Sequence, residues 1–271
     1  MASLETIALL AAALVGGLYV AACLIYYKLS WAICRLERQT TNQANNVISQ
    51  IEALLSLYAE IRPTHGLPPT RGWAASPDFL RLLTRFVSET QPMTVVECSS
   101  GLSTLVLAAC MRSQGQGHVY SLEHEPEFAA KTRDLIRLHD LGEWATIVDA
   151  PLQELSLPNW EGPWYDTTGL PSDIAIDMLV IDGPPQSTAP LARYPALPVL
   201  GKRMRPGGIV LLDDADRADE RLITAAWKKE CPSLSDIPFV SAEKGVACLK
   251  QQIQSLACAM SPDVEPRYLQ V

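Results

Sequence analysis

The sequence predicts an α/β fold: a seven-stranded, mostly parallel sheet with helices on both faces, preceded by one transmembrane helix. Two observations predict the sheet. Apolar strand segments alternate with helical segments after residue 93, and an acidic residue closes each of the first five strands. A third observation, an uncharged apolar run near the amino terminus, predicts the membrane helix.

The apolar run from Thr6 to Tyr27 contains no charged residue. As a helix it would be roughly 33 Å long, enough to cross a hydrocarbon core of about 30 Å. Basic residues follow it at Lys28, Arg35 and Arg38, so the positive-inside rule predicts a single-pass anchor with the body in the cytoplasm. The alternatives are a signal peptide, which normally has basic residues before the run, a lipoprotein cleavage box at Val20–Cys23, and a buried core helix.

A helical connector and a Pro-rich linker follow the anchor. Apolar residues recur there at spacings of three and four, which puts them on one helix face: Val47, Ile51, Leu54, Tyr58 and Ile61. This face either packs on the chain's own domain or pairs two copies in a homodimer. The expected organisation is an anchor (1–34), a connector and linker (35–70), the α/β domain (71–250) and a tail (251–271).

The elements of the α/β domain follow from hydrophobic periodicity and from breakers. A first helix is expected from about Asp78 to Glu89, because Ser76-Pro77-Asp78 is typical of a helix start. Seven strands are expected at Met93–Glu97, His118–Glu123, Ala145–Asp149, Met178–Ile181, Gly208–Leu212, Phe239–Ser241 and Val246–Lys250. Further helices are expected at Leu102–Met111, Glu127–Leu138, Leu191–Met204 and Asp216–Lys229, with Ser99 and Ser100 as candidate caps of the first of these.

Acidic residues mark the carboxyl ends of the parallel strands. They are Glu97, Glu123, Asp149, Asp182 and the pair Asp213-Asp214. Ligands of open α/β sheets bind beyond these ends, and carboxylates that would be costly inside a core can face a cleft there. The sequence therefore predicts a ligand site at this edge.

The segment from about residue 71 to 250 resembles the class I S-adenosylmethionine-dependent methyltransferases. The motifs that carry the resemblance are Val95–Thr104, Tyr120–His124, Ile181–Pro185 and Arg205–Asp214. The resemblance implies a Rossmann-like fold with a last antiparallel strand, and S-adenosylmethionine as the cofactor. One departure is Ser99, which stands where the family has the first glycine of its acid-x-Gly-x-Gly turn.

The resemblance also implies roles for residues at the strand ends. Glu123 would accept hydrogen bonds from both ribose hydroxyls, Glu97 would orient the methionine ammonium, and Asp149 would contact the adenine amino group. The N–H groups of the helix after Gly101 would attract the methionine carboxylate. The full set of implied cofactor-binding residues is Glu97, Ser99, Gly101, Ser103, Glu123, His124, Asp149 and Ala150.

Asp182, Asp213 and Asp214 are the candidate catalytic residues. Methyl transfer is an in-line displacement in which the enzyme positions the acceptor and can remove a proton. In catechol-type O-methyltransferases, acids at similar strand ends hold a divalent metal, so the resemblance leaves Mg²⁺ open as a second cofactor. The alternative is structural: Asp213 caps the helix that starts at Asp216, and Asp182 orders its Pro-rich loop.

Two aromatic features are candidates for the acceptor side of the site. Trp73 precedes the first strand and is a candidate lid, and the insertion from Pro158 to Pro171 carries three aromatic residues that we expect to shape the acceptor pocket.

Composition narrows the partners and the compartment. The net charge of −8 argues against nucleic-acid binding, which needs a basic face. The seven cysteines form no CxxC pair, which indicates a reducing compartment. The predicted function is methyl transfer to a small-molecule, lipid-linked or protein acceptor at the cytoplasmic face of a membrane. The alternatives are a catalytically inactive scaffold with this fold and an NAD-dependent oxidoreductase, which the missing G-x-G-x-x-G disfavours.

Overall fold

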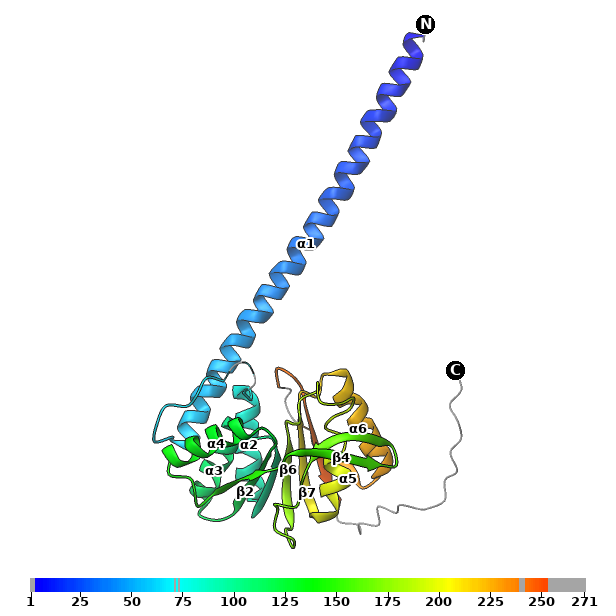
Figure 1. The fold of residues 1–271 in the computed structure, drawn as a ribbon. Helices are drawn as coiled ribbons and strands as arrows, with labels where there is room; N and C mark the ends of the chain where they lie inside the picture. The colour runs from blue at the N-terminus through cyan, green and yellow to red at the C-terminus, as the bar shows by residue number, and fades with distance from the viewer. Residues whose placement is uncertain (1–2, 71, 73, 239–241, 253–271) are drawn as a thin grey trace. The chain divides into compact units, whose positions relative to one another are not determined.

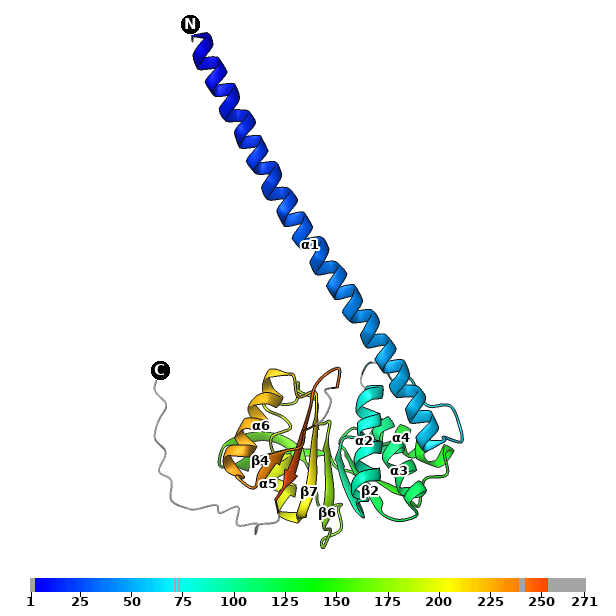
Figure 2. The same ribbon diagram turned by 180° about the vertical axis from the view of Figure 1, so that it is seen from behind.

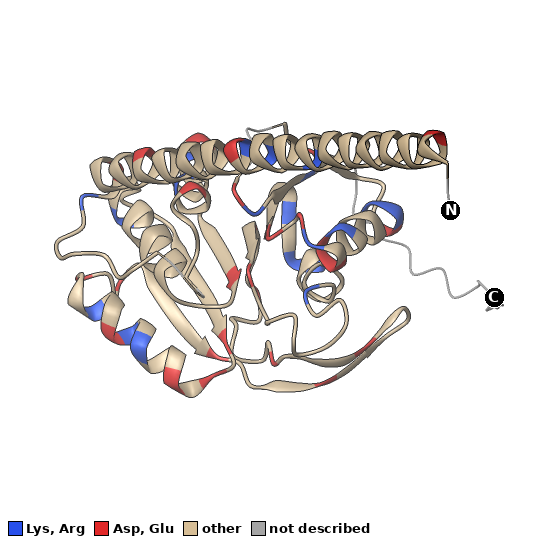
Figure 3. Ribbon diagram, turned by 90° about the horizontal axis from the view of Figure 1, so that it is seen from above, with Lys and Arg blue, Asp and Glu red and all other residues tan. Residues whose placement is uncertain are grey.

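The computed structural model describes residues 3–252 apart from 71, 73 and 239–241, and it divides into two compact units, Met1–Ile51 and Glu52–Val271. The first unit is the amino-terminal part of α1 (Leu4–Ile61). Apart from Glu5, the first turns of this helix carry no charged residue (Figure 3). Among the described residues, α1 alone has the length and composition to cross a membrane; a signal sequence would pass the same test. None of its apolar window is buried, unlike the window of a core helix.

The second unit is built on a seven-stranded sheet in the order β3-β2-β1-β6-β7-β9-β8 (Figures 1 and 2). Its strands are β1 (Thr94–Cys98), β2 (His118–Glu123), β3 (Ala145–Asp149), β6 (Ile176–Ile181), β7 (Met204–Asp213), β8 (Leu234–Asp236) and β9 (Val246–Gln251). The first five run parallel, and β9 lies antiparallel to both β7 and β8. The strand order reverses between β1 and β6, which is where such sheets bind ligands.

Two hydrophobic clusters cover the two faces of the sheet, because successive side chains of a strand point to opposite faces. On β1, Val95 belongs to one cluster and Val96 to the other. The first cluster involves α2 (Pro77–Thr90), α3 (Leu102–Gln114), α4 (Pro126–Leu138) and the last turns of α1. The second involves α5 (Ala196–Leu200), α6 (Ala218–Glu230) and a two-stranded hairpin of β4 (Leu152–Leu157) and β5 (Trp160–Tyr165).

The end of α1 packs on the chain's own domain, as the first of our two interpretations of the connector expects. The buried face differs from the predicted one, however. Ala53, Leu57 and Ile61 are buried, whereas Tyr58 from the predicted stripe remains 38% exposed. The spacing of three and four fitted two overlapping stripes of this helix, and the one centred on Leu57 is buried in the first hydrophobic cluster.

Two predicted elements differ in the structure, and a third cannot be compared with it. The helix expected over Leu191–Met204 is reduced to α5 and a 3₁₀ turn at Gly201–Arg203. Leu191 has φ +53°, outside the helical region, and Pro195 is the N-cap of α5, so the helix starts only at Ala196. The insertion from Pro158 to Pro171 contains β5, which pairs with β4 just before it to form a hairpin. The strand expected at Phe239–Ser241 lies outside the described residues, and the strand beside β9 is β8.

Candidate functional site

The turn between β1 and α3 has the backbone geometry of a glycine-rich turn although it contains one glycine. Ser99 has φ +119° and Gly101 has φ +143°. The Ser99 N–H donates to the carbonyl oxygen of Leu122 on β2 at 3.0 Å. A non-glycine residue in such a conformation costs roughly 1–3 kcal/mol and persists where the surroundings enforce it. Gly101 is the N-cap of α3 without a side-chain cap, so the prediction that a serine caps this helix was wrong.

Glu97, on the strand that precedes this turn, stabilises the turn through hydrogen bonds. Its Oε2 accepts hydrogen bonds from Thr104 Oγ1 and Ser121 Oγ, each at 2.6 Å, and Thr104 Oγ1 in turn accepts the Gly101 N–H at 3.1 Å. Glu97 Oε1 is buried and makes no hydrogen bond of regular geometry, although the Ser103 hydroxyl is close enough to lower the pKa of the carboxyl. Burial outweighs these hydroxyls and raises the pKa of Glu97.

Glu123, at the end of β2, is held as an anion. Its Oε2 accepts the Ser100 hydroxyl at 2.7 Å, its Oε1 accepts the Glu125 N–H at 3.0 Å, and His124 Nδ1 lies 3.2 Å from Oε1. Burial raises the pKa of Glu123, but these three partners together outweigh burial and leave it below its ordinary value. A carboxylate ionised at neutral pH can accept further hydrogen bonds from a ligand.

Asp149 and Ala150, at the end of β3, have protein partners. The Asp149 side chain is 70% exposed and pairs with Arg133 at 2.6 Å. The Ala150 N–H donates to the carbonyl oxygen of Glu123 at 2.7 Å. Of the acids at the first three strands, the structure therefore buries Glu97 and Glu123 near the turn and leaves Asp149 at the surface.

Asp182, Asp213 and Asp214 form a second group of acids at the ends of β6 and β7. One oxygen of each lies within 4.8 Å of the others. Asp214 has φ +58°, a second left-handed residue at this edge of the sheet. Burial raises the pKa of Asp182 to about 6 and that of Asp213 to about 8, with the neighbouring acids adding to both shifts. Asp213 does not cap α6, which starts after Arg217 without a side-chain cap.

A buried arginine that sequence analysis did not single out lies among these acids. Arg193 Nη2 lies 3.2 Å from Asp182 Oδ1 and 3.1 Å from Asp214 Oδ2, and it donates to the Asp182 carbonyl oxygen at 2.7 Å. Its Nη1 donates to the Asp213 carbonyl oxygen at 3.0 Å. The three acids offer the oxygen ligands that magnesium prefers, but two of the three carboxylates already contact this guanidinium.

Tyr165 is one of the three aromatic residues of the insertion from Pro158 to Pro171 that we expect to shape the acceptor pocket. It ends the β4–β5 hairpin, it is 3% exposed, and its hydroxyl has no hydrogen-bond partner among the described residues. A Cβ on Gly183 would collide with this hydroxyl and lie 3.1 Å from Ser99 Cβ, so the hydroxyl lies where the strand order reverses. The ring also packs edge-on against His124 at 5.7 Å between centroids.

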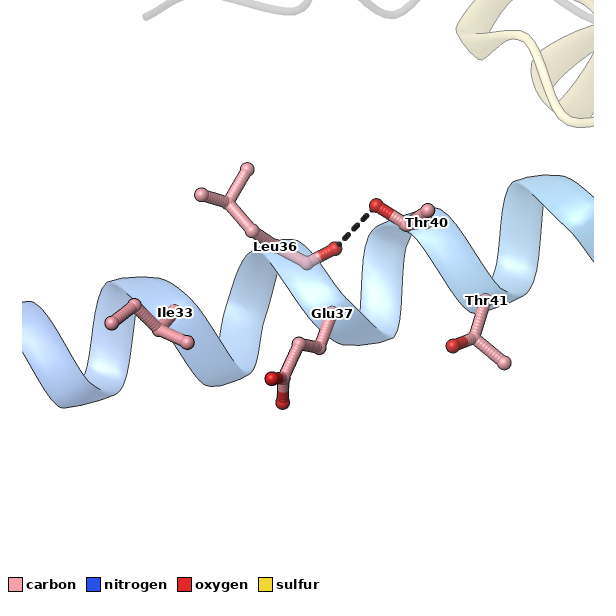
Figure 4. Close-up of a pocket in the computed structure, with 5 residues that line it drawn as sticks. All are labelled: Ile33, Leu36, Glu37, Thr40 and Thr41. Atoms are coloured by element: carbon pink, nitrogen blue, oxygen red, sulfur yellow. Dashed lines mark hydrogen bonds between the residues drawn. The ribbon is translucent and has the colours of Figure 1, made fainter.

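Two further features lie apart from these acids. Trp73, the candidate lid, is outside the described residues, so its role as a lid stays a prediction. A hollow on α1 is lined by five residues that all belong to that single helix, and it contains none of the strand-end acids (Figure 4). One helix face does not enclose a ligand, so we assign no site to it.

Comparison with known proteins agrees with this geometry. A family model described as a methyltransferase domain matches residues 96–215. A methyltransferase from Podospora anserina, solved with SAH, is similar to the chain with a TM-score of 0.52 and 13% identity over 78% of this chain and 96% of that one. The METTL16 MTase domain is similar with a TM-score of 0.50 and 9% identity, over 76% and 80% of the two chains. Curated proteins gave no match.

The sheet order, the turn after β1 and the acids at the strand ends define a Rossmann-like domain of the methyltransferase type. The methyltransferase-domain model matches residues 96–215, from β1 to just past β7, and the chain has the Rossmann-like fold that its sequence motifs predict.

Proposed function

We propose that the domain binds S-adenosylmethionine above β1 and β2 and transfers its methyl group to an acceptor above β6 and β7, at the cytoplasmic face of a membrane. The observation that carries this proposal is a group of buried polar atoms, at the carboxyl edge of the sheet, that make no hydrogen bond of regular geometry to the described residues. They are Glu97 Oε1, Tyr165 Oη and Asp213 Oδ1. Because buried polar atoms are nearly always hydrogen-bonded, unpartnered ones on three neighbouring segments support a site for a polar ligand.

The cofactor half would work through groups that are already ordered. Glu123 is an ionised carboxylate and can accept two vicinal ribose hydroxyls. The N–H groups at the start of α3, behind Gly101 and Ser103, carry the positive end of a helix dipole and can bind the methionine carboxylate. Glu97 would orient the methionine ammonium through Oε1, and His124 would line the ribose side. Asp149 now pairs with Arg133, and the Ala150 N–H donates to the Glu123 carbonyl oxygen. To contact the adenine, these two residues would have to exchange these partners or share them with the ligand.

The acceptor half would supply positioning and a proton acceptor. Asp213 has an unpartnered Oδ1 and a pKa of about 8, which is close to the working pH that suits a general base. Asp182 and Asp214 hold Arg193 and thereby orient the loops after β6 and β7. Tyr165 would direct its hydroxyl at the acceptor or the transferred group, which gives the aromatic insertion the pocket-forming role predicted for it.

The membrane location rests on α1. Residues 1–34 would anchor the chain and residues 35–70 would connect the anchor to the domain of residues 71–250, with the basic residues after the apolar run on the cytoplasmic side. S-Adenosylmethionine is a soluble nucleoside, so a cytoplasmic domain has direct access to it. This location would favour a lipid-linked acceptor most, because both the acceptor and the domain would be held at the same membrane surface.

Cofactor binding is tested with the full chain purified in detergent and titrated calorimetrically with S-adenosylmethionine, S-adenosylhomocysteine and NAD. We expect saturable binding of the first two and none of NAD. Absence of heat at millimolar S-adenosylmethionine, with no shift in thermal midpoint, would overturn the proposal. Binding of NAD alone would favour the oxidoreductase.

Transfer is tested with methyl-labelled S-adenosylmethionine added to membranes and cytosol of cells that lack the chain. Label that appears with the added chain in the organic extract, in the acid-precipitated protein or in the soluble small molecules identifies the acceptor class. An Asp213→Asn chain serves as the control for background transfer. Intact cofactor binding with label in none of the fractions would favour the scaffold. Ser99 is the best support for that alternative in the sequence, and the support is weakened because Ser99 keeps a glycine-like φ of +119°.

A further inference from the structure

We propose that the guanidinium of Arg193 serves as the internal cation of the acid group at β6 and β7, so that this site is built to work without a divalent metal ion. The acid group is defined as Asp182, Asp213 and Asp214. The proposal concerns the charge balance of this group and holds whether or not S-adenosylmethionine is bound.

The first argument is geometric. Arg193 Nη2 lies 3.2 Å from Asp182 Oδ1 and 3.1 Å from Asp214 Oδ2, so it contacts two of the three carboxylates that an ion would need. Magnesium binds oxygen at about 2.0–2.1 Å, so an ion on those same two oxygens would lie no more than about 5 Å from the guanidinium. Two positive groups so close together in a buried site repel each other strongly, because little solvent screens them.

The second argument is that the guanidinium is fixed in its place. Arg193 is 4% exposed, and its Nη1 and Nη2 donate to the carbonyl oxygens of Asp213 and Asp182 as well as contacting carboxylates. Its planar fork therefore links the carboxyl ends of β6 and β7. An ion could enter on these oxygens only if several hydrogen bonds of the arginine broke at once.

The third argument is the remaining charge. Asp214 Oδ2 has a second guanidinium, Arg217 Nη1, at 2.9 Å, and Glu220 Oε1 lies 3.7 Å from Arg193 Nη1. Among the described residues near Arg193, Asp213 Oδ1 and Glu220 Oε2 are buried oxygens without a hydrogen-bond partner. The acid group therefore already faces two guanidinium groups, those of Arg193 and Arg217, before any ion is added.

These contacts give Arg193 a positioning role with a consequence for the acceptor. A metal ion can chelate two adjacent oxygens of a substrate, whereas here both terminal nitrogens of the guanidinium already contact protein oxygens. The acceptor would therefore meet the Asp213 oxygen and the Tyr165 hydroxyl rather than a metal. This favours an acceptor with a single nucleophilic atom over one with two vicinal hydroxyls.

The test measures Mn²⁺ binding to the full chain in detergent at pH 7.5. Binding is detected as a decrease in the paramagnetic resonance signal of the free ion. We expect the wild-type chain to show no binding up to 1 mM (about the upper end of typical weak sites), and a thermal midpoint that EDTA does not change. Arg193→Met removes the charge and keeps an unbranched side chain, so it should bind Mn²⁺ at least tenfold more tightly than the 1 mM limit of the wild type. The double variant Arg193→Met with Asp213→Asn should lose that binding. Arg217→Met is the matched control and should gain no Mn²⁺ site.

Wild-type binding of Mn²⁺ at micromolar concentrations that Asp182→Asn or Asp213→Asn abolishes would overturn the proposal. If Arg193→Met does not fold, Arg193→Lys retains a positive charge, and it should fold and remain free of Mn²⁺. Binding of Mn²⁺ by a folded Arg193→Lys chain as tightly as expected for the methionine variant would also overturn it. None of these readouts requires S-adenosylmethionine, so they are independent of the proposed transfer.

Discussion

The carboxylates at β1 and β2 are stabilised by neutral donors, whereas those at β6 and β7 surround a buried guanidinium. Glu97 and Glu123 accept hydrogen bonds from hydroxyls and from one N–H. Asp182 and Asp214 instead contact Arg193. Burying a neutral hydrogen-bond donor costs little free energy, and a carboxylate with several such donors keeps the others when one is lost. A buried charge needs its opposite charge, so the second half should be far more sensitive to the loss of one residue.

The largest effect that separates the two halves is expected for Arg193→Met. It leaves several carboxylates buried without their cation, and we expect a loss of roughly 3–5 kcal/mol in the free energy of unfolding. Arg217→Met removes a guanidinium that is 42% exposed and contacts the same Asp214 oxygen, so it should cost no more than about 1 kcal/mol. Denaturant unfolding of both variants measures the difference, and equal losses would contradict the distinction.

Glu123→Gln should weaken the cofactor half without disturbing the fold. The amide keeps the shape but loses the charge that would bind the ribose hydroxyls, which corresponds to about 10–100-fold in the dissociation constant of S-adenosylmethionine. Glu125→Gln is the control, since that side chain is 57% exposed. Calorimetric titration of both variants checks this. Unchanged affinity in Glu123→Gln would remove Glu123 from the cofactor site.

Asp213→Asn should change the pH dependence of stability. Asp213 ionises near pH 3.8 when unfolded but near pH 8 when folded, so between these values the folded chain holds a proton that the unfolded chain has released. Its contribution to stability therefore falls as pH rises, by up to about 1.4 kcal/mol per pH unit. Relative to the wild type, the asparagine variant should become more stable from pH 4 to pH 8. A constant difference across that range would contradict the raised pKa.

The smallest effect is expected for Ser99→Gly. Glycine adopts φ +119° without a clash, so the variant should gain about 1 kcal/mol in the free energy of unfolding and keep its affinity for S-adenosylmethionine. Ser100→Gly is the contrasting control: it loses the 2.7 Å hydrogen bond to Glu123 and should be destabilised. Thermal unfolding compares the two. Destabilisation by Ser99→Gly would show that the serine side chain outweighs the strain of its backbone.

The sequence predicted the turn after β1 better than the surroundings of the acid group, and the reason is distance along the chain. Glu97, Gly101 and Thr104 lie within one βα unit, so spacing and residue type alone indicate a turn over a carboxylate. The acid group was also predicted, because its members end strands. Arg193 was missed because no motif in the residues around it indicates that its side chain lies among the acids. One signal was present: three acids expected at the ends of two neighbouring buried strands require a basic residue nearby.

Sequence by itself determined the α/β class, the apolar helix and the strand ends, because hydrophobic periodicity and turn residues act locally. Only the tertiary structure decided which face of α1 is buried, how the hairpin brings Tyr165 to Gly183, and which cation stands among the acids. These outcomes depend on packing between segments far apart in the sequence. Burial then sets the electrostatics, because the removal of water raises the pKa of Asp213 and makes a fixed guanidinium necessary.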